Sequence, residues 1–189
     1  MQNIVEFILE TGVLKRTPRS GWSLLGIDHA ESVADHSFRC AVIGYLLAHM
    51  EKVSVHKVLL MTLFNDIHEA RITDLHKMAQ RYVAAERAED TSFEEQISAL
   101  PKEMSDELSG LREDYRRQVS GESIVARDCD ILEFLIQAKE YYEHGQKSAA
   151  LFMKKAPKHL KTDSARALWK LAESADVNEW WTRISSFSR

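Results

Sequence analysis

Over residues 64–76 the sequence reads FNDIHEARITDLH, where ionisable side chains interrupt an otherwise apolar helical pattern. If one helix runs from Val55 to Ala70, Asn65, His68 and Glu69 share one face, because His68 and Glu69 follow Asn65 by three and four residues. Asp66 and Glu69 also have the three-residue spacing of helix neighbours. The stretch therefore predicts carboxylates and an imidazole within one helical turn, as metal binding or acid–base chemistry requires.

The rest of the chain predicts an all-α protein. Apolar residues recur every three or four positions, which is the period of a helix packed on one face. The 189 residues include only 7 Gly and 3 Pro, and no stretch alternates as a strand would. A chain of this length fits one domain covering residues 1–189.

Composition narrows the expected partners. Lys and Arg total 25 against 29 Asp and Glu, a formal net charge of -4, so no basic field favours a nucleic-acid polymer. No apolar run reaches the roughly 18 residues that span a bilayer, and the N-terminus lacks a signal-peptide pattern. Cys40 and Cys129 lie in apolar helical patterns and are expected as buried thiols. We therefore expect a cytoplasmic protein that binds a small ligand, without a membrane partner.

After a short first helix that ends at Gly12, two more predicted helices precede the end of residues 64–76. Ser32 is placed to cap the earlier of these two, and Ser54 the later. The predicted buried face of the earlier one consists of Phe38, Ala41, Val42, Tyr45 and Leu46. His36 lies in its first turns, where local evidence alone favours a structural role over metal binding. After the stretch, Asp74 is placed to cap a helix over residues 75–83.

A long connection over residues 13–31 combines basic residues, turn formers and one large aromatic residue. Arg19 and Trp22 suit an anion held beside a planar ring. The alternative is a surface loop in which Trp22 packs against the core. Local evidence alone favours packing, because loop tryptophans commonly act as packing anchors.

A long helix is predicted over about residues 122–144, with Asp130 between apolar neighbours. A carboxylate there is either partnered or exposed, because burying an unpaired charge costs several kcal/mol. The local pattern alone favours exposure. Two C-terminal helices follow, and Trp180 and Trp181 are expected to pack onto the core or a second subunit.

His36, the pair at positions 65 and 66, and Asp130 follow one another on separate predicted helices. This order resembles the HD-domain metal-dependent phosphohydrolases, whose pattern is a His, an adjacent His-Asp pair and a distant Asp. The segments ESVADHS (31–37), DIHEARITD (66–74) and RDCDILE (127–133) are similar to the 5′-deoxynucleotidase branch. The resemblance covers about residues 1–145, and the helices of about 146–189 complete the expected domain.

The resemblance implies an HD-type helical bundle that forms a homodimer. It also implies metal-dependent release of phosphate from nucleoside 5′-monophosphates, with deoxynucleotides favoured. One divalent cation, Mn, Co or Mg, would be bound by His36, Asn65, Asp66 and Asp130. The implied catalytic residues are Glu69, which would activate water, and Asp74, which would assist in positioning or proton transfer. The implied substrate-binding residues are Arg19 for the phosphate and Trp22 for the sugar.

Asn65 departs from the family pattern, which has histidine at this position. An amide oxygen is a hard ligand compatible with Mg or Mn, but it is much poorer than imidazole for Co, Ni or Zn. The sequence thus predicts a weaker or altered metal site, and His68, one turn further along, is the alternative ligand. A nucleotide-binding regulator without turnover and a purely structural bundle are the alternatives. The sequence would be the same whether Asn65 arose by natural divergence or by deliberate replacement of a histidine.

Overall fold

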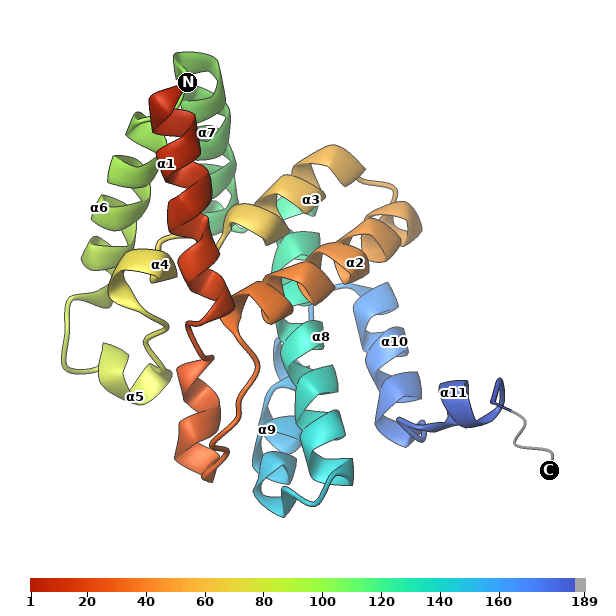
Figure 1. Cartoon of the computed structure of the whole chain (residues 1–189). Coiled ribbons are helices and arrows are strands. Elements are labelled where there is room, and N and C mark those ends of the chain that lie inside the picture. Colours follow the sequence, from red (N-terminus) through yellow and green to blue (C-terminus); the bar gives the residue numbers. More distant parts are fainter. Residues whose placement is uncertain (186–189) are drawn as a thin grey trace.

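The computed structural model describes residues 1–185, and three helices form the centre of this part of the chain. They are α2 (Val33–Glu51), α3 (Val55–Phe64) and α8 (Gly121–Glu143), which pack against one another in Figure 1. No β-sheet occurs among the described residues, where Pro18 and Ser32 form an isolated bridge. The prediction of an all-α helical bundle is confirmed.

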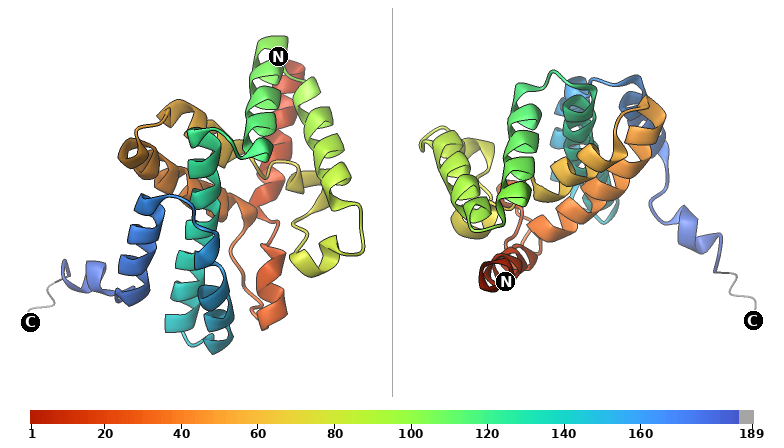
Figure 2. Two further views of the ribbon diagram at one scale, coloured as in Figure 1. Left: turned by 180° about the vertical axis from the view of Figure 1, so that it is seen from behind. Right: turned by 90° about the horizontal axis from the view of Figure 1, so that it is seen from above.

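The other elements surround this centre. The remaining α-helices are α1 (Gln2–Thr11), α4 (Glu69–Ile72), α5 (Lys77–Gln80), α6 (Ala85–Ser98), α7 (Lys102–Arg117), α9 (Ala150–Lys155), α10 (Asp163–Ser174) and α11 (Glu179–Thr182). Short 3-10 helices cover Gly12–Lys15, Ser20–Leu25, Lys147–Ala149 and Pro157–His159. Figure 2 shows α6 and α7 on one side of the centre and α10 and α11 on the other. No helix within residues 1–185 combines the length and apolar character needed to cross a bilayer.

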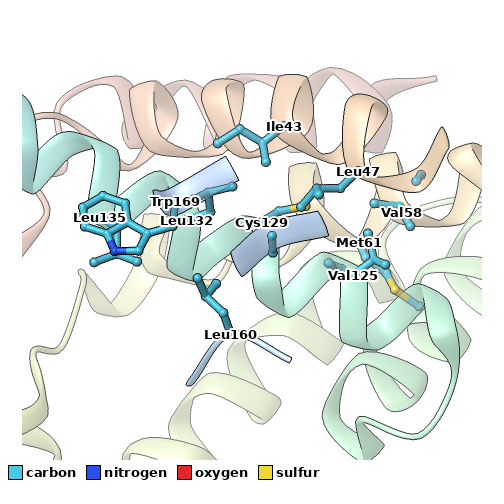
Figure 3. Packing of buried hydrophobic residues seen from close by; sticks show 13 residues of the cluster. Ile43, Leu47, Val58, Met61, Val125, Cys129, Leu132, Leu135, Leu160 and Trp169 are labelled. Carbon is cyan, nitrogen blue, oxygen red and sulfur yellow. The ribbon is translucent and has the colours of Figure 1, made fainter. Parts of the chain in front are cut away.

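The main core lies between α2, α3, α8 and α10. Leu47, Val58, Met61 and Leu132 are among its buried side chains, and Figure 3 shows how they interlock. Burying each such side chain contributes about 1.5–3 kcal/mol to folding. Cys129 lies in the same cluster as a free thiol. The core therefore holds together the helices that carry the candidate site.

The predicted buried face of α2 is wrong except at Ala41. Phe38 is 70% exposed, and the other exposed members of that face are Val42, Tyr45 and Leu46. The helix instead buries the face that carries Gly44 and Leu47. A Cβ atom at Gly44 would lie 3.1 Å from Val58 Cγ1, so the small residue permits close approach of α3. Helix α3 packs closely against the face of α2 that carries Gly44, so this face is buried and the larger apolar side chains on the other face remain exposed.

The predicted single helix from Val55 to Ala70 is also wrong. The α3 helix ends at Phe64, and turns connect it to α4. The amides of Glu69, Ala70 and Arg71 each bond to the carbonyl three residues earlier, at 3.0–3.1 Å. This tighter spacing changes the direction of successive side chains relative to an α-helix. The side chains of His68 and Glu69 therefore lie in different surroundings from those that one continuous helix would give them.

Asp128 anchors the C-terminal part of the chain to α8. Its buried carboxylate accepts hydrogen bonds from the amide of Lys161 (2.9 Å) and from the amide and hydroxyl of Thr162 (both 2.7 Å). Thr162 in turn caps α10. Beyond α10, Trp180 is 66% exposed, so its predicted packing on the core is wrong, whereas packing on a second subunit stays a prediction.

We expect Asp128→Asn to lower the free energy of unfolding by about 2–3 kcal/mol, because an amide cannot accept all of these hydrogen bonds and leaves buried donors unpaired. Urea denaturation measures the change. The matched control is Asp163→Asn, since the Asp163 side chain is 99% exposed. We expect it to change stability by less than about 0.5 kcal/mol. Equal effects of the two substitutions would contradict the anchoring role of Asp128.

Candidate functional site

His36 lies at the centre of a cluster of ionisable side chains. Its Nε2 atom is 3.2 Å from Asp130 Oδ1 and 3.7 Å from Asp66 Oδ2. The three residues come from α2, α8 and the turn after α3, which pack around one core. His36 and Asp66 are buried, and Asp130 is largely so. The structure thus brings together three of the side chains that the sequence resemblance assigned to one metal site.

Two arginines balance the carboxylates. Arg19 Nη1 lies 3.5 Å from Asp66 Oδ2, and its Nη2 lies 3.9 Å from Asp130 Oδ1. Arg127 Nη1 lies 3.1 Å from Asp130 Oδ2. Burial disfavours the charge of Arg19, but Asp66 and Asp130 outweigh it and raise the pKa of Arg19. The local expectation of an exposed Asp130 is wrong, because the structure partners this carboxylate instead.

Asn65 faces the same cluster. Its Nδ2 donates a hydrogen bond of 2.6 Å to Asp66 Oδ1. A small cavity beside it is also lined by His36, Asp66 and Asp130. His68 does not line this cavity. Its role as a substitute ligand stays a prediction, and burial lowers the pKa of its imidazole.

Glu69 begins α4 and is buried. Its Oε2 atom has no hydrogen-bond partner among the described residues. Burial, followed by the charges of Asp66 and Asp74, raises the pKa of Glu69 well above its ordinary value. Arg19 acts in the opposite direction. Glu69 is therefore a buried carboxyl group that has one oxygen without a hydrogen-bond partner among the described residues and lies near the charges of Asp66, Asp74 and Arg19.

Asp74 connects the segment that carries Arg19 to residues 64–76. Its Oδ2 atom accepts a hydrogen bond of 2.7 Å from the amide of Ser20. The predicted capping role of Asp74 is wrong, because α5 is capped by His76, whose Nδ1 accepts from the amide of Ala79 at 3.1 Å. Thr73, directly before Asp74, has a φ of 62°, which is rare for a β-branched residue.

Trp22 fixes the other end of this segment. It is 1% exposed, and its ring stacks on Phe134 with the centroids 4.9 Å apart. Its Nε1 donates a hydrogen bond of 3.0 Å to Glu31 Oε1. The packing interpretation of Trp22 is confirmed, whereas contact with a sugar stays a prediction. Burial, together with Glu133, raises the pKa of Glu31 to about 7.

Glu133 is a site residue to which sequence reasoning gave no role. It is fully buried on α8, one turn after Asp130, and hydrogen-bonds with His36 Nδ1. Its other oxygen accepts from Arg39 Nε at 2.9 Å. The sequence feature that could have indicated this role is a glutamate among apolar residues, three positions after the candidate ligand Asp130.

The donor set fits a hard divalent cation. Two carboxylates, one imidazole and one amide oxygen are ligands that suit Mg²⁺ or Mn²⁺. Donor atoms of His36, Cys40 and Glu133 also lie within 4.8 Å of one another. That group is less suitable, because burial raises the pKa of Cys40 to about 12 and keeps it a thiol. The fold and site define an all-α protein with a buried His–Asx–Asp centre suited to a divalent cation.

Comparison with known proteins identifies the family. The HD domain model matches residues 11–171. The chain is 30% identical over 152 residues to the 5′-deoxynucleotidase HDDC2 of Bos taurus, which covers 79% of this chain and 73% of that one. The Danio rerio protein of the same name is 32% identical over 147 residues, covering 76% and 72%. The solved structure of the PH0347 protein from Pyrococcus horikoshii has a TM-score of 0.76 and 31% identity, covering 90% and 96%. The chain belongs to the HD domain family.

The pKa of Glu31 predicts a pH-dependent stability. Because the pKa is about 7 in the folded chain against an ordinary value of 4.5, folding favours the protonated carboxyl. Its stabilising effect is complete below pH 4.5 and is lost as the pH rises through 7. In Glu31→Gln, where an amide oxygen can still accept from Trp22, we expect the fall in unfolding free energy between acidic and alkaline pH to shrink by about 2 kcal/mol.

Urea denaturation at a series of pH values measures this difference. Glu103→Gln is the control, because Glu103 is exposed on α7 and should leave the pH dependence unchanged. Parallel profiles for wild type and Glu31→Gln would show that burial of Glu31 does not shift its titration.

Proposed function

We propose that the protein is a metal-dependent phosphohydrolase, a single HD-type domain that releases phosphate from nucleoside 5′-monophosphates and favours deoxynucleotides. The observation that carries this proposal is the position of His36 Nε2 facing Asp66 and Asp130. The unpartnered buried oxygen of Glu69 supports it. The 5′-deoxynucleotidase names of the curated relatives support the substrate class.

One divalent cation would be held by His36, Asn65, Asp66 and Asp130. When bound, it would withdraw charge from the phosphoryl oxygens and lower the pKa of a coordinated water. Among Mn, Co and Mg, the amide oxygen of Asn65 favours Mg or Mn, because Co gains more from an imidazole ligand.

Glu69 would accept the proton of the attacking water. A general base must lie close to its proton and be free of competing hydrogen bonds, and Glu69 Oε2 has no such bond among the described residues. The raised pKa of this carboxyl favours retention of the proton once it is taken. Asp74 would act through its hydrogen bond to Ser20, which positions the segment next to Arg19.

Arg19 would bind the phosphate of the substrate. A phosphate monoester hydrolyses very slowly without a catalyst, so its charge must be neutralised. The planar guanidinium of Arg19 offers two parallel donors, and it already faces Asp66 and Asp130. Trp22 anchors this segment in the core, so it would fix the shape of the pocket on the sugar side and disfavour a 2′-hydroxyl.

The protein would act as a homodimer in the cytoplasm. Large apolar side chains of α2, among them Phe38, Tyr45 and Leu46, remain exposed on one chain. A contiguous apolar surface commonly marks a protein interface. Sedimentation equilibrium tests this part of the proposal: a mass of 21.7 kDa, that of one chain, at micromolar concentration would contradict it.

A nucleotide-binding regulator without turnover is the second candidate, favoured by Asn65 in place of the family histidine. Calorimetry separates the two functions. Nucleotide binding that is insensitive to added metal, without phosphate release, would support the regulator.

For the enzyme, we expect metal-dependent phosphate release from deoxynucleoside 5′-monophosphates. Glu69→Gln should lower kcat by about 10²–10⁴-fold, the usual contribution of a general base. Metal binding, measured by calorimetry with Mn²⁺, should persist in this variant. Retained turnover in Glu69→Gln would remove Glu69 from the mechanism.

Asn65→His tests the metal preference of the site. An imidazole should strengthen binding of Co²⁺ more than binding of Mg²⁺, and it should raise turnover with Co²⁺. Phosphate release and metal titration are measured with Mn²⁺, Co²⁺ and Mg²⁺ in turn. Absence of phosphate release from every deoxynucleoside monophosphate, in both wild type and Asn65→His, would overturn the proposed function.

A further inference from the structure

A buried ion-pair network connects His36 to the outer side of α8. Glu133 is fully buried and lies between two partners on α2. One carboxylate oxygen hydrogen-bonds with His36 Nδ1, and the other accepts from Arg39 Nε at 2.9 Å. A buried charge is tolerated only when it is partnered and hydrogen-bonded. Both requirements are met here.

Arg39 extends the network towards solvent. It lies three residues after His36, and its Nη1 atom donates to Glu140 Oε1 at 2.8 Å. Its Nη2 atom also lies 2.8 Å from Glu133 Oε1, so the guanidinium of Arg39 compensates the charge of the buried carboxylate.

The network decides which nitrogen of His36 is available. A proton on Nδ1 is held by Glu133, so Nε2 is the atom that faces Asp66 and Asp130. An ionised hydrogen-bond acceptor also makes an imidazole a more basic ligand. Glu133 itself cannot readily bind a cation, because both of its oxygens are already engaged.

We propose that Glu133 and Arg39 are positioning residues that keep the Nδ1 proton of His36 in place and present its Nε2 atom as the metal ligand. The proposal rests on the proposed metal-dependent function and assigns roles to two residues outside the predicted ligand set. Neither residue belongs to the proposed ligand or substrate-binding set. Both act through the orientation and basicity of His36.

The first test is the Mn²⁺ affinity of the full chain, measured by calorimetry. Glu133→Gln should weaken binding about 10–100-fold, because a neutral amide replaces the ionised acceptor. Arg39→Gln should weaken it by a smaller factor, since Glu133 remains. The matched control is Asp128→Asn, which neutralises another fully buried carboxylate on α8 that bonds to Lys161 and Thr162. It should lose stability but keep wild-type affinity.

The second test is the imidazole proton spectrum, recorded without metal and with Mg²⁺. Wild type and Asp128→Asn should share a slowly exchanging, downfield Nδ1 proton of His36. In Glu133→Gln this resonance should move upfield or disappear. The spectrum decides the inference even if wild type binds no cation, an outcome that would instead count against the proposed function.

Two results would overturn the inference. One is an unchanged His36 Nδ1 resonance, or unchanged Mn²⁺ affinity, in folded Glu133→Gln. The other is an equal loss of affinity in Asp128→Asn, which would show a general effect of lost stability. If Glu133→Gln does not fold, Arg39→Gln carries the decision: wild-type affinity and an unshifted Nδ1 resonance in that variant would overturn the inference.

Discussion

The contact of His36 with the carboxylates of Asp66 and Asp130 is the constraint on which the rest of the structure depends. Three partly or fully buried ionisable groups can lie this close only if their charges are compensated. Arg19 and Arg127 supply that compensation from different parts of the chain. The helices α2, α3 and α8 must therefore keep their mutual register, and the apolar core between them maintains it.

Much of the fold and part of the site could be predicted from the sequence. The helical period is a local property, so the all-α class and the long helix α8 were accessible. Ligand-type residues could be recognised by their order along the chain. The buried face of α2 could not be predicted from the sequence, because the close approach of Gly44 to Val58 depends on how the two helices pack. Glu133 was missed for the same reason, since its partners His36 and Arg39 lie about 95 residues away.

Asp74 and Trp22 show how much a local pattern can predict about a residue near the site: the capping role of Asp74 is wrong, whereas the packing of Trp22 is confirmed. A capping position and a loop tryptophan are structural features with ordinary explanations. In the structure, Asp74 bonds to Ser20 and Trp22 packs on Phe134, so both hold the segment that carries Arg19. Such contacts between distant segments leave no periodic signal in the sequence. Their effect is to hold the segment that carries Arg19 beside the candidate centre.

The central claim is that the His36, Asp66 and Asp130 cluster, together with Asn65, binds one divalent cation. Anomalous diffraction from crystals soaked in Mn²⁺ tests it most directly. The account predicts a single anomalous peak bonded to His36 Nε2 and to carboxylate oxygens of Asp66 and Asp130. A peak bonded instead to Cys40 and Glu133, or no peak at a Mn²⁺ concentration that supports phosphate release, would contradict it.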